Sequence, residues 1–281
     1  MITCNLMGGL GNQLFQICAT ISYAITSRQT FKFLNVSTLG GGGCTLRHTF
    51  WNSFLIKLKP FLVDNISNPI TQIREKDFTF NELPILQTNN VIINGYFQSY
   101  KYFQENYELI CRLIGLKQMK ETLLANPSLN FYGLQNTISM HFRIGDYKPI
   151  QHCHPIMTKE YYHKSLKYIQ SVNSNTNFTV LYFCEDVDVN DVNVIINYLK
   201  QEFPTFEFIC GSNRINGLED WEQMLLMSCC HHNIIANSSF SWWGAYFNEC
   251  SDKIVCYPSV WFGPAIKHNT DDLCPLNWIR I

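Results

Sequence analysis

The sequence has little charge, and neither sign prevails. Its 281 residues contain 21 lysines and arginines against 22 aspartates and glutamates, and charged residues make up only 15%. This balance excludes a broad basic surface for nucleic acid, so an anionic ligand must be held by a few placed groups. Hydrophobic residues make up 46%, which is enough for a sizeable core and excludes a disordered chain.

Long apolar runs and targeting segments are missing as well. No run reaches the roughly 18 apolar residues of a transmembrane helix. The segment from Met1 to Gly9 has neither the basic region nor the long apolar core of a signal peptide. We therefore expect a cytoplasmic protein with at most peripheral membrane contact. The 12 cysteines, several of them inside apolar runs, are expected to be reduced core thiols.

Short apolar segments alternate with helical patterns, which predicts an α/β protein with parallel, doubly wound sheets. In the second half, strands are expected at 137–142, 178–184, 206–210, 233–236 and 254–257, with helices at 159–172, 189–202, 219–230 and 242–249. In the first half, strands are expected at 2–6, 31–34 and 91–96, with helices at 14–25 and 100–116. Pro127 and Gly133 interrupt the pattern, so we expect two domains, residues 1–130 and 131–281.

Three segments directly follow predicted strands, where ligands of such sheets bind. They are residues 8–13, 143–147 and 237–241. Two facing domains would bring them together across a cleft.

The first of these segments is glycine-rich but matches neither common phosphate-binding fingerprint. Leu14 stands where the dinucleotide pattern needs a glycine, and no Gly-Lys-Ser/Thr follows. What remains is a helix start whose free N–H groups favour a phosphate or carboxylate. A tight turn that packs helix on strand explains the segment equally well.

His141 and Arg143 occupy alternate positions at the end of a predicted strand, so their side chains point to the same side. An arginine beside an apolar strand needs a partner, because burying an unpaired charge is costly. That partner is either Asp146, in a structural ion pair, or a diphosphate gripped by the planar guanidinium. A buried histidine in a core role is the alternative for His141.

Small hydroxyl groups follow the predicted strand 233–236. Ser238 and Ser239, with the amides of the next helix, either cap that helix or hold a phosphate. Trp242 and Trp243 are expected to pack in the core or between domains.

Two further groups contain metal-binding residue types. Cys229-Cys-His-His232 points around a helix and offers no C-x-x-C pair, so no zinc site is expected there. Asp186 and Asp188 form an Asp-x-Asp, which elsewhere holds a divalent metal and a nucleotide diphosphate. We favour a solvated loop for them.

Several segments together resemble glycosyltransferase family 11, the α-1,2-fucosyltransferases. They are MGGLGNQLFQ (7–16), GYFQSYKYF (95–103), HFRIGDY (141–147), NIIANSSFSWWGAYF (233–247) and the tail through Trp278, in the family's order and spacing. The resemblance implies a GT-B arrangement, two Rossmann-like domains facing a cleft, with the acceptor side on the first domain. It implies inverting transfer of L-fucose from GDP-β-L-fucose to the 2-hydroxyl of a galactose or similar sugar on a glycan. No essential metal or other cofactor is implied.

By the same resemblance, the donor would be bound by ten residues: Gly9, Gly11, Asn12, Gln13, His141, Arg143, Asn237, Ser238, Ser239 and Phe240. Arg143 and His141 are the candidate catalytic residues, and Asp146 is a candidate base. The chain departs from the family at Ile144, where many members have a second arginine, and at Gln223, where many have an aspartate. Two alternatives stay open: a metal-dependent nucleotide-sugar transferase using Asp186 and Asp188, or an inactive module that binds glycans or nucleotides.

Overall fold

The computed structural model of the chain describes residues 1–40, 46–66, 71–86, 88, 90–129, 134–174, 176–214 and 217–281. Its internal contacts divide it into two compact units. The first comprises Met1–Met119 with His268–Pro275, and the second comprises Lys120–Lys267 with Leu276–Ile281. The prediction was a single boundary after residue 130. The contacts instead place residues 120–129 in the second unit and residues 268–275 in the first. Part of the predicted linker, residues 130–133, lies outside the described residues.

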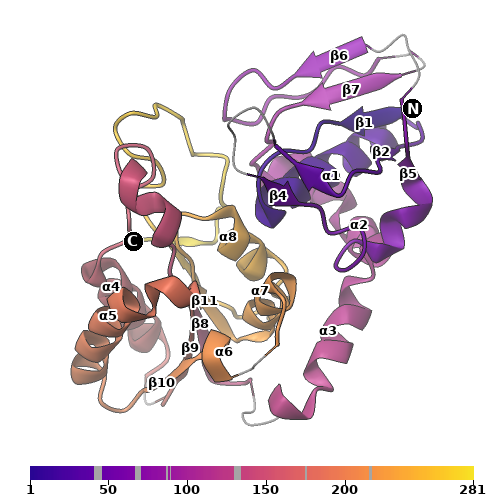
Figure 1. The fold of residues 1–281 in the computed structure, drawn as a ribbon. Helices are drawn as coiled ribbons and strands as arrows, with labels where there is room; N and C mark the ends of the chain where they lie inside the picture. The colour runs from indigo at the N-terminus through magenta and orange to yellow at the C-terminus, as the bar shows by residue number, and fades with distance from the viewer. Residues whose placement is uncertain are drawn as a thin grey trace. The chain divides into compact units, whose positions relative to one another are not determined.

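The second unit is built on a parallel sheet with the order β10-β9-β8-β11-β12-β13 (Figure 1). Its strands are β8 (Thr137–His141), β9 (Thr179–Phe183), β10 (Glu207–Cys210), β11 (His232–Ile234), β12 (Val255–Tyr257) and β13 (Ile279–Arg280). From β8 the chain proceeds outward to β10 and then returns to the other side of β8 as β11. This reversal is the topological switch point of a doubly wound sheet. The predicted α/β class is confirmed here, and only the short β13 was not predicted.

Helices cover both faces of this sheet (Figure 1). They are α4 (Lys159–Val172), α5 (Val189–Glu202), α6 (Gly211–Arg214), α7 (Asp220–Cys229) and α8 (Ser239–Tyr246), with short 3-10 turns η4 (Pro127–Leu129), η5 (Gly145–Ile150) and η6 (Asp186–Asp188). The bounds of α4 and α5 agree with the prediction, whereas α8 begins earlier than residue 242 because Ser238 caps it.

Alternation along β8 divides its side chains between the two faces. Ile138, Met140 and Phe142 are buried in the apolar core that α4 and α5 cover. Ser139 and His141 therefore face the opposite side, toward α7 and α8. Trp242 and Trp243 of α8 are fully buried, which confirms the predicted packing role.

The first unit contains a smaller parallel sheet, with the order β1-β7-β6. The strands of the whole unit are β1 (Ile2–Cys4), β2 (Phe33–Leu34), β3 (Thr38–Leu39), β4 (Arg47–His48), β5 (Leu62–Val63), β6 (Thr71–Arg74) and β7 (Val91–Asn94). β2 pairs with β5 in parallel, and β3 pairs with β4 in an antiparallel ladder. The strand β6 was not predicted, because its TQIR sequence lacks an apolar run.

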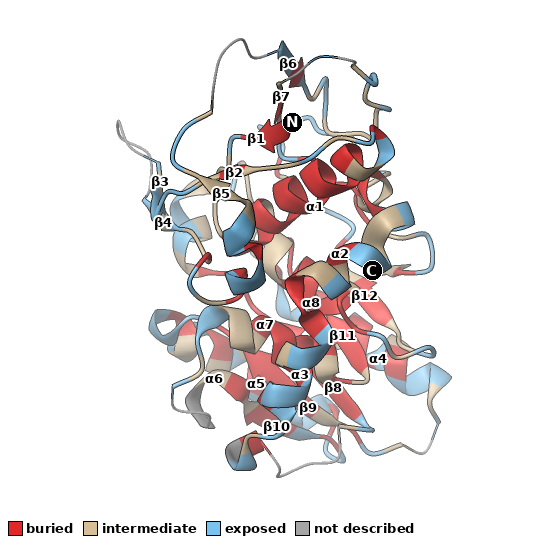
Figure 2. Cartoon of the chain, turned by 90° about the vertical axis from the view of Figure 1, so that its right-hand side faces the viewer, coloured by how far each residue is buried: buried red, intermediate tan, exposed pale blue. Residues whose placement is uncertain are grey.

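Helix α1 (Leu10–Thr26) is the buried helix of this unit (Figure 2). The other helical segments are η1 (Ile56–Phe61), η2 (Tyr100–Tyr102), η3 (Gln104–Asn106), α2 (Tyr107–Ile114) and α3 (Leu116–Leu124), which crosses the boundary between the units. One continuous helix over 100–116 was therefore wrong. Gly115 adopts φ 76°, a left-handed conformation that ends α2. Among the described residues, every helix is too short or too polar to cross a membrane.

Candidate functional site

Two of the three predicted ligand segments meet at the switch point of the second unit. One follows β8 and the other follows β11, and these two strands pair directly. The Tyr147 hydroxyl donates a hydrogen bond to the carbonyl oxygen of Asn237 at 3.1 Å. The rings of His141 and Phe240 lie 5.6 Å apart between centroids. The structure therefore brings HFRIGDY and the Asn-Ser-Ser-Phe segment together at the sheet edge where ligands bind.

His141 is buried at the end of β8 and is uncharged at neutral pH. Burial, with a smaller contribution from the Arg143 charge, lowers its pKa to about 3. Its Nδ1 atom is buried and has no hydrogen-bond partner among the described residues. A neutral imidazole has one donor and one acceptor nitrogen, so this side chain retains hydrogen-bonding capacity beside Arg143.

Arg143 forms ion pairs with two carboxylates. Its Nη2 donates to Asp146 at 2.6 Å and its Nη1 donates to Glu185 at 3.1 Å. Burial acts to lower the pKa of Arg143, but these carboxylates and Tyr147 outweigh it and raise the pKa. The side chain keeps 21% of its surface exposed. A charged guanidinium is thus held in place at the switch point.

Glu185 belongs to this site, although sequence reasoning did not single it out. It lies two residues after β9, the neighbour of β8, and its side chain is 60% exposed. The strand-end position was the available signal, because residues just past adjacent parallel strands share one edge.

Asp188 positions the loop that carries Arg143. Its buried carboxylate accepts a hydrogen bond from the Gly145 amide at 2.8 Å. Its other oxygen lies 3.7 Å from Nζ of Lys148. Asp186 is exposed at the start of the same 3-10 turn, η6. The two aspartates therefore differ in environment, and only Asp188 is engaged by the loop after β8.

The start of α8 is defined by a serine cap. The Ser238 hydroxyl accepts from the amide of Phe240 at 3.4 Å. Asn237 is buried, and its amide group donates to the carbonyls of Pro155 and Trp261, both at 3.0 Å. Ser239 and Phe240 are partly exposed in the first turn. Capping accounts for Ser238, while the ring of Phe240 in the first turn of α8 lies beside the ring of His141.

The glycine-rich segment belongs to the first unit. Gly8 has φ +76°, and a Cβ atom on it would lie 2.4 Å from Nδ2 of Asn12. Gly9 forms the N-cap of α1 without a side-chain hydrogen bond, and a Cβ atom there would meet nothing within 4 Å. The two glycines therefore differ in role. The turn requires a glycine at position 8, whereas Gly9 leaves open space at the start of α1.

Side chains of α1 hold this turn in place. Gln13 is fully buried and donates to the carbonyl of Gly8 at 3.0 Å and to that of His48 at 2.8 Å. Asn12 is half-buried and accepts from Gln98 at 2.8 Å. Gly11 is buried within the first turn of α1. Of the four candidates in this unit, Gly9 and Asn12 lie closest to solvent.

Residues 1–281 match the profile of glycosyl transferase family 11. The chain belongs to this family. The chain is also similar to an Escherichia coli alpha-1,2-colitosyltransferase, with 27% identity over all of this chain and 99% of that protein. A second relative is the Escherichia coli O-antigen biosynthesis glycosyltransferase WbnK, with 29% identity over the full length of both chains.

Two solved structures are similar at 10% sequence identity. One is a variant of Arabidopsis thaliana FUT1 in complex with GDP, with a TM-score of 0.46 over 90% of this chain and 69% of that chain. The other is a glycosyl transferase family 9 protein from Veillonella parvula, with a TM-score of 0.47 over all of this chain and 86% of that chain. The family assignment rests on the sequence match.

The chain departs from the family 11 pattern at Ile144 and Gln223, and these two side chains lie in different surroundings. Ile144 is buried in the apolar core of the second unit, as the alternation from Arg143 predicts. Gln223 lies on α7, and its side chain makes long contacts of 3.5 Å with Ser212 and the carbonyl of Leu218. Ile144 therefore contributes packing, and Arg143 is the arginine of this motif that reaches the site.

Proposed function

We propose that this family 11 glycosyltransferase transfers L-fucose from GDP-β-L-fucose to the 2-hydroxyl of galactose or a similar sugar on a glycan. One observation carries the proposal: Arg143 and His141 converge with the start of α8 at the switch point. The donor would bind the second unit there. The first unit, with residues 1–130 as its predicted domain, would supply the acceptor side and the Gly9–Asn12 helix start.

The chemical demand is to stabilise a leaving diphosphate that gains negative charge as the bond to fucose C1 breaks. Preorganised donors aimed at that charge meet this demand. The Arg143 guanidinium has five N–H groups, and its contacts to Asp146 and Glu185 use two of them. The remaining groups can bind phosphate while both carboxylates stay in place. The amides and dipole of α8 add to the same field.

Asp146 is proposed as either the base for the acceptor hydroxyl or a positioning residue for Arg143. Its carboxylate is 45% exposed and contacts Nη2 of Arg143. Asp146→Asn removes the base and leaves an amide oxygen to accept from Arg143. A base role predicts a loss in kcat of about 100-fold or more with little change in donor KM. Wild-type kcat in this variant would exclude the base role.

The decisive experiment mixes the purified chain with GDP-fucose and a panel of β-galactosides. We expect GDP release that depends on the acceptor, and a product whose linkage analysis shows fucose on O2 of galactose. Binding of GDP-fucose without turnover, for every galactoside offered, would instead support the inactive binding module.

Colitose is a second candidate for the transferred sugar. The full-length relative named alpha-1,2-colitosyltransferase favours it. Colitose is L-fucose without its 3-hydroxyl group. A site that hydrogen-bonds this hydroxyl discriminates against the deoxy analogue, whose kcat/KM falls by about 10⁴-fold or more. The ratio of kcat/KM for GDP-fucose and GDP-colitose therefore identifies the natural donor.

A metal-dependent reaction through Asp186 and Asp188 is the remaining rival. The engagement of Asp188 with Gly145 and Lys148 favours a positioning role instead. Asp186→Asn is therefore the informative variant, because Asp186 is exposed and its replacement leaves the loop contacts intact. Full activity in this variant, and in the wild type with excess EDTA, would remove the rival. Loss of activity in both would support it.

A further inference from the structure

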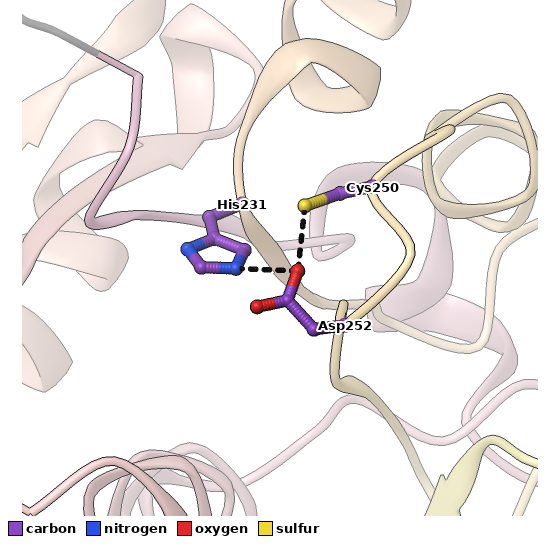
Figure 3. A group of neighbouring side chains, drawn as sticks. All are labelled: His231, Cys250 and Asp252. Atoms are coloured by element: carbon purple, nitrogen blue, oxygen red, sulfur yellow. Dashed lines mark hydrogen bonds and ion pairs between the residues drawn. The ribbon is translucent and has the colours of Figure 1, made fainter.

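A second cluster of reactive side chains lies at the opposite end of β11 from the site described above. It consists of His231, Cys250 and Asp252 (Figure 3). His231 directly precedes β11, whereas Cys250 and Asp252 lie in the turn after α8. The catalytic candidates follow the carboxyl end of the same strand. The cluster is thus separate from Arg143 and His141.

The three side chains offer one nitrogen, one sulfur and one oxygen ligand. Nε2 of His231 lies 3.1 Å from Oδ1 of Asp252, and Sγ of Cys250 lies 3.1 Å from the same oxygen. All three ligand atoms lie within 4.8 Å of one another. A tetrahedral zinc ion with bonds of about 2.0–2.3 Å holds its ligand atoms about 3.3–3.6 Å apart. Side-chain rotation is therefore enough to close the set around an ion.

The imidazole of His231 is poorly satisfied in hydrogen bonding. Both of its ring nitrogens are buried. Among the described residues neither has a hydrogen-bond partner of good geometry, although Nε2 faces Oδ1 of Asp252 at 3.1 Å. Its ring stacks on His232 with centroids 4.1 Å apart, which fixes its orientation. A buried polar atom without a partner is costly, and a metal bond to Nε2 would satisfy one of the two nitrogens.

Buried Asn248 holds the two halves of the cluster together. Its Nδ2 donates to the carbonyl of His231 at 3.3 Å, and its Oδ1 accepts from the amide of Cys250 at 2.8 Å. The same Nδ2 also donates to the carbonyl of Cys230 at 2.8 Å. The ligand-bearing backbone segments are therefore tied to each other before any ion binds, as supporting residues do in metal sites.

We propose that His231, Cys250 and Asp252 bind a zinc ion, with water as the fourth ligand. Mixed imidazole, thiolate and carboxylate ligands suit this metal. Binding displaces the thiol proton of Cys250, which now donates to Asp252, so one Zn–S bond forms and one proton is released. The thiolate and the carboxylate together neutralise the ion's two positive charges.

The ion would have a structural role. It would join the chain entering β11 to the turn leaving α8, and α8 carries the Ser238–Phe240 segment at its other end. The site was not expected from the sequence, because Cys229–His232 alone offers no suitable pair. Its partners come from residues 250–252, which only the tertiary structure places beside His231.

Cobalt substitution tests the site on the full chain. The metal-free protein is titrated with Co²⁺ under anaerobic conditions, and the thiolate-to-cobalt charge-transfer band is recorded. We expect this band at one equivalent, with Zn²⁺ displacing the cobalt. Cys250→Ser should abolish the band, and Cys111→Ser, which changes a half-buried thiol on α2, should retain it. Absence of the band in the wild type, or its survival in Cys250→Ser, would overturn the proposal.

A second measurement guards against misfolded variants. Asp252→Asn changes a largely exposed side chain, so the fold should be retained, and zinc affinity should fall by about tenfold or more. Zinc should raise the Tm of the wild type and of Cys111→Ser, and should leave the Tm of Cys250→Ser unchanged. Equal zinc-induced shifts in all variants would also contradict the site.

Discussion

At the scale of residues, the site depends on charges that are held by their neighbours. Arg143 sits between Asp146 and Glu185, and His141 is buried beside it in its neutral form. Strand alternation predicted that His141 and Arg143 share a side. The burial of Ile144 in the apolar core agrees with this. Glu185 completes the arrangement, because the end of β9 lies next to the end of β8.

Replacing Arg143 by alanine is expected to remove activity and retain the fold. Removal of one such donor typically costs about 100-fold or more in rate, about 3 kcal/mol. The two carboxylates that lose their partner are 45% and 60% exposed, so water can solvate them. Steady-state kinetics and thermal unfolding measure the two effects. Arg112→Ala, an exposed arginine on α2, serves as the control. Near wild-type turnover in Arg143→Ala would remove this residue from the mechanism.

The lowered pKa of His141 predicts how the free energy of unfolding depends on pH. Its pKa falls from an ordinary value of 6.5 to about 3 in the folded chain. Between these values only the unfolded chain binds the proton, so acid stabilises the unfolded state. The free energy of unfolding should therefore fall as pH drops from about 6.5 toward 3, by at most about 1.4 kcal/mol per pH unit from this group. Urea unfolding at several pH values measures the slope. An equally steep slope in His141→Gln would assign the effect to other groups.

At the scale of elements, the regular alternation in the second half predicted helices and strands well, and the first half less well. Helices α4 and α5 have the predicted bounds, because their apolar period and flanking polar residues are clear. The strand β6 has the sequence TQIR and becomes a strand only because β7 pairs with it. The helix expected over 100–116 is divided by turns and by Gly115.

The glycine turn before α1 yields a matched pair of variants. Gly8→Ala forces a side chain into φ +76° and against Asn12, so we expect a loss of stability of about 1 kcal/mol or more. Gly9→Ala meets open space at an ordinary φ of −77° and should cost less than about 1 kcal/mol. Tm and kcat/KM are measured for both. A Gly9→Ala variant of normal stability but reduced activity would support approach of a ligand to this helix start.

Normal stability in Gly8→Ala would contradict the steric argument. Normal activity in Gly9→Ala would argue against a ligand at that position.

At the scale of the whole molecule, the end of the chain contributes to both units. Residues 268–275 belong to the first unit, where Asp272 forms an ion pair with Lys101 and accepts from the amide of Phe80 at 3.0 Å. The last residues return to the second unit as β13. The predicted division at residue 130 did not include this return, because the tail has no regular pattern that reveals its partners.

The state of the cysteines is a prediction for the whole chain. Of the 12 cysteines, the 11 that the structure describes are all free thiols. Protein purified without reductant, unfolded and treated with maleimide should therefore add twelve labels, which intact mass spectrometry counts. A shortfall of two labels, restored by prior reduction, would reveal a disulfide.

The sequence by itself determined the α/β class, the strand ends where the site lies and the family of the chain, because these depend on local period and on contiguous motifs. The tertiary structure decided which strand ends are neighbours. It placed Glu185 on Arg143, gave Asp188 to Gly145 instead of a solvated loop, and brought Cys250 and Asp252 to His231. These contacts join segments far apart in the chain. Sheet order and the return of the chain after α8 create them, and no local pattern records either one.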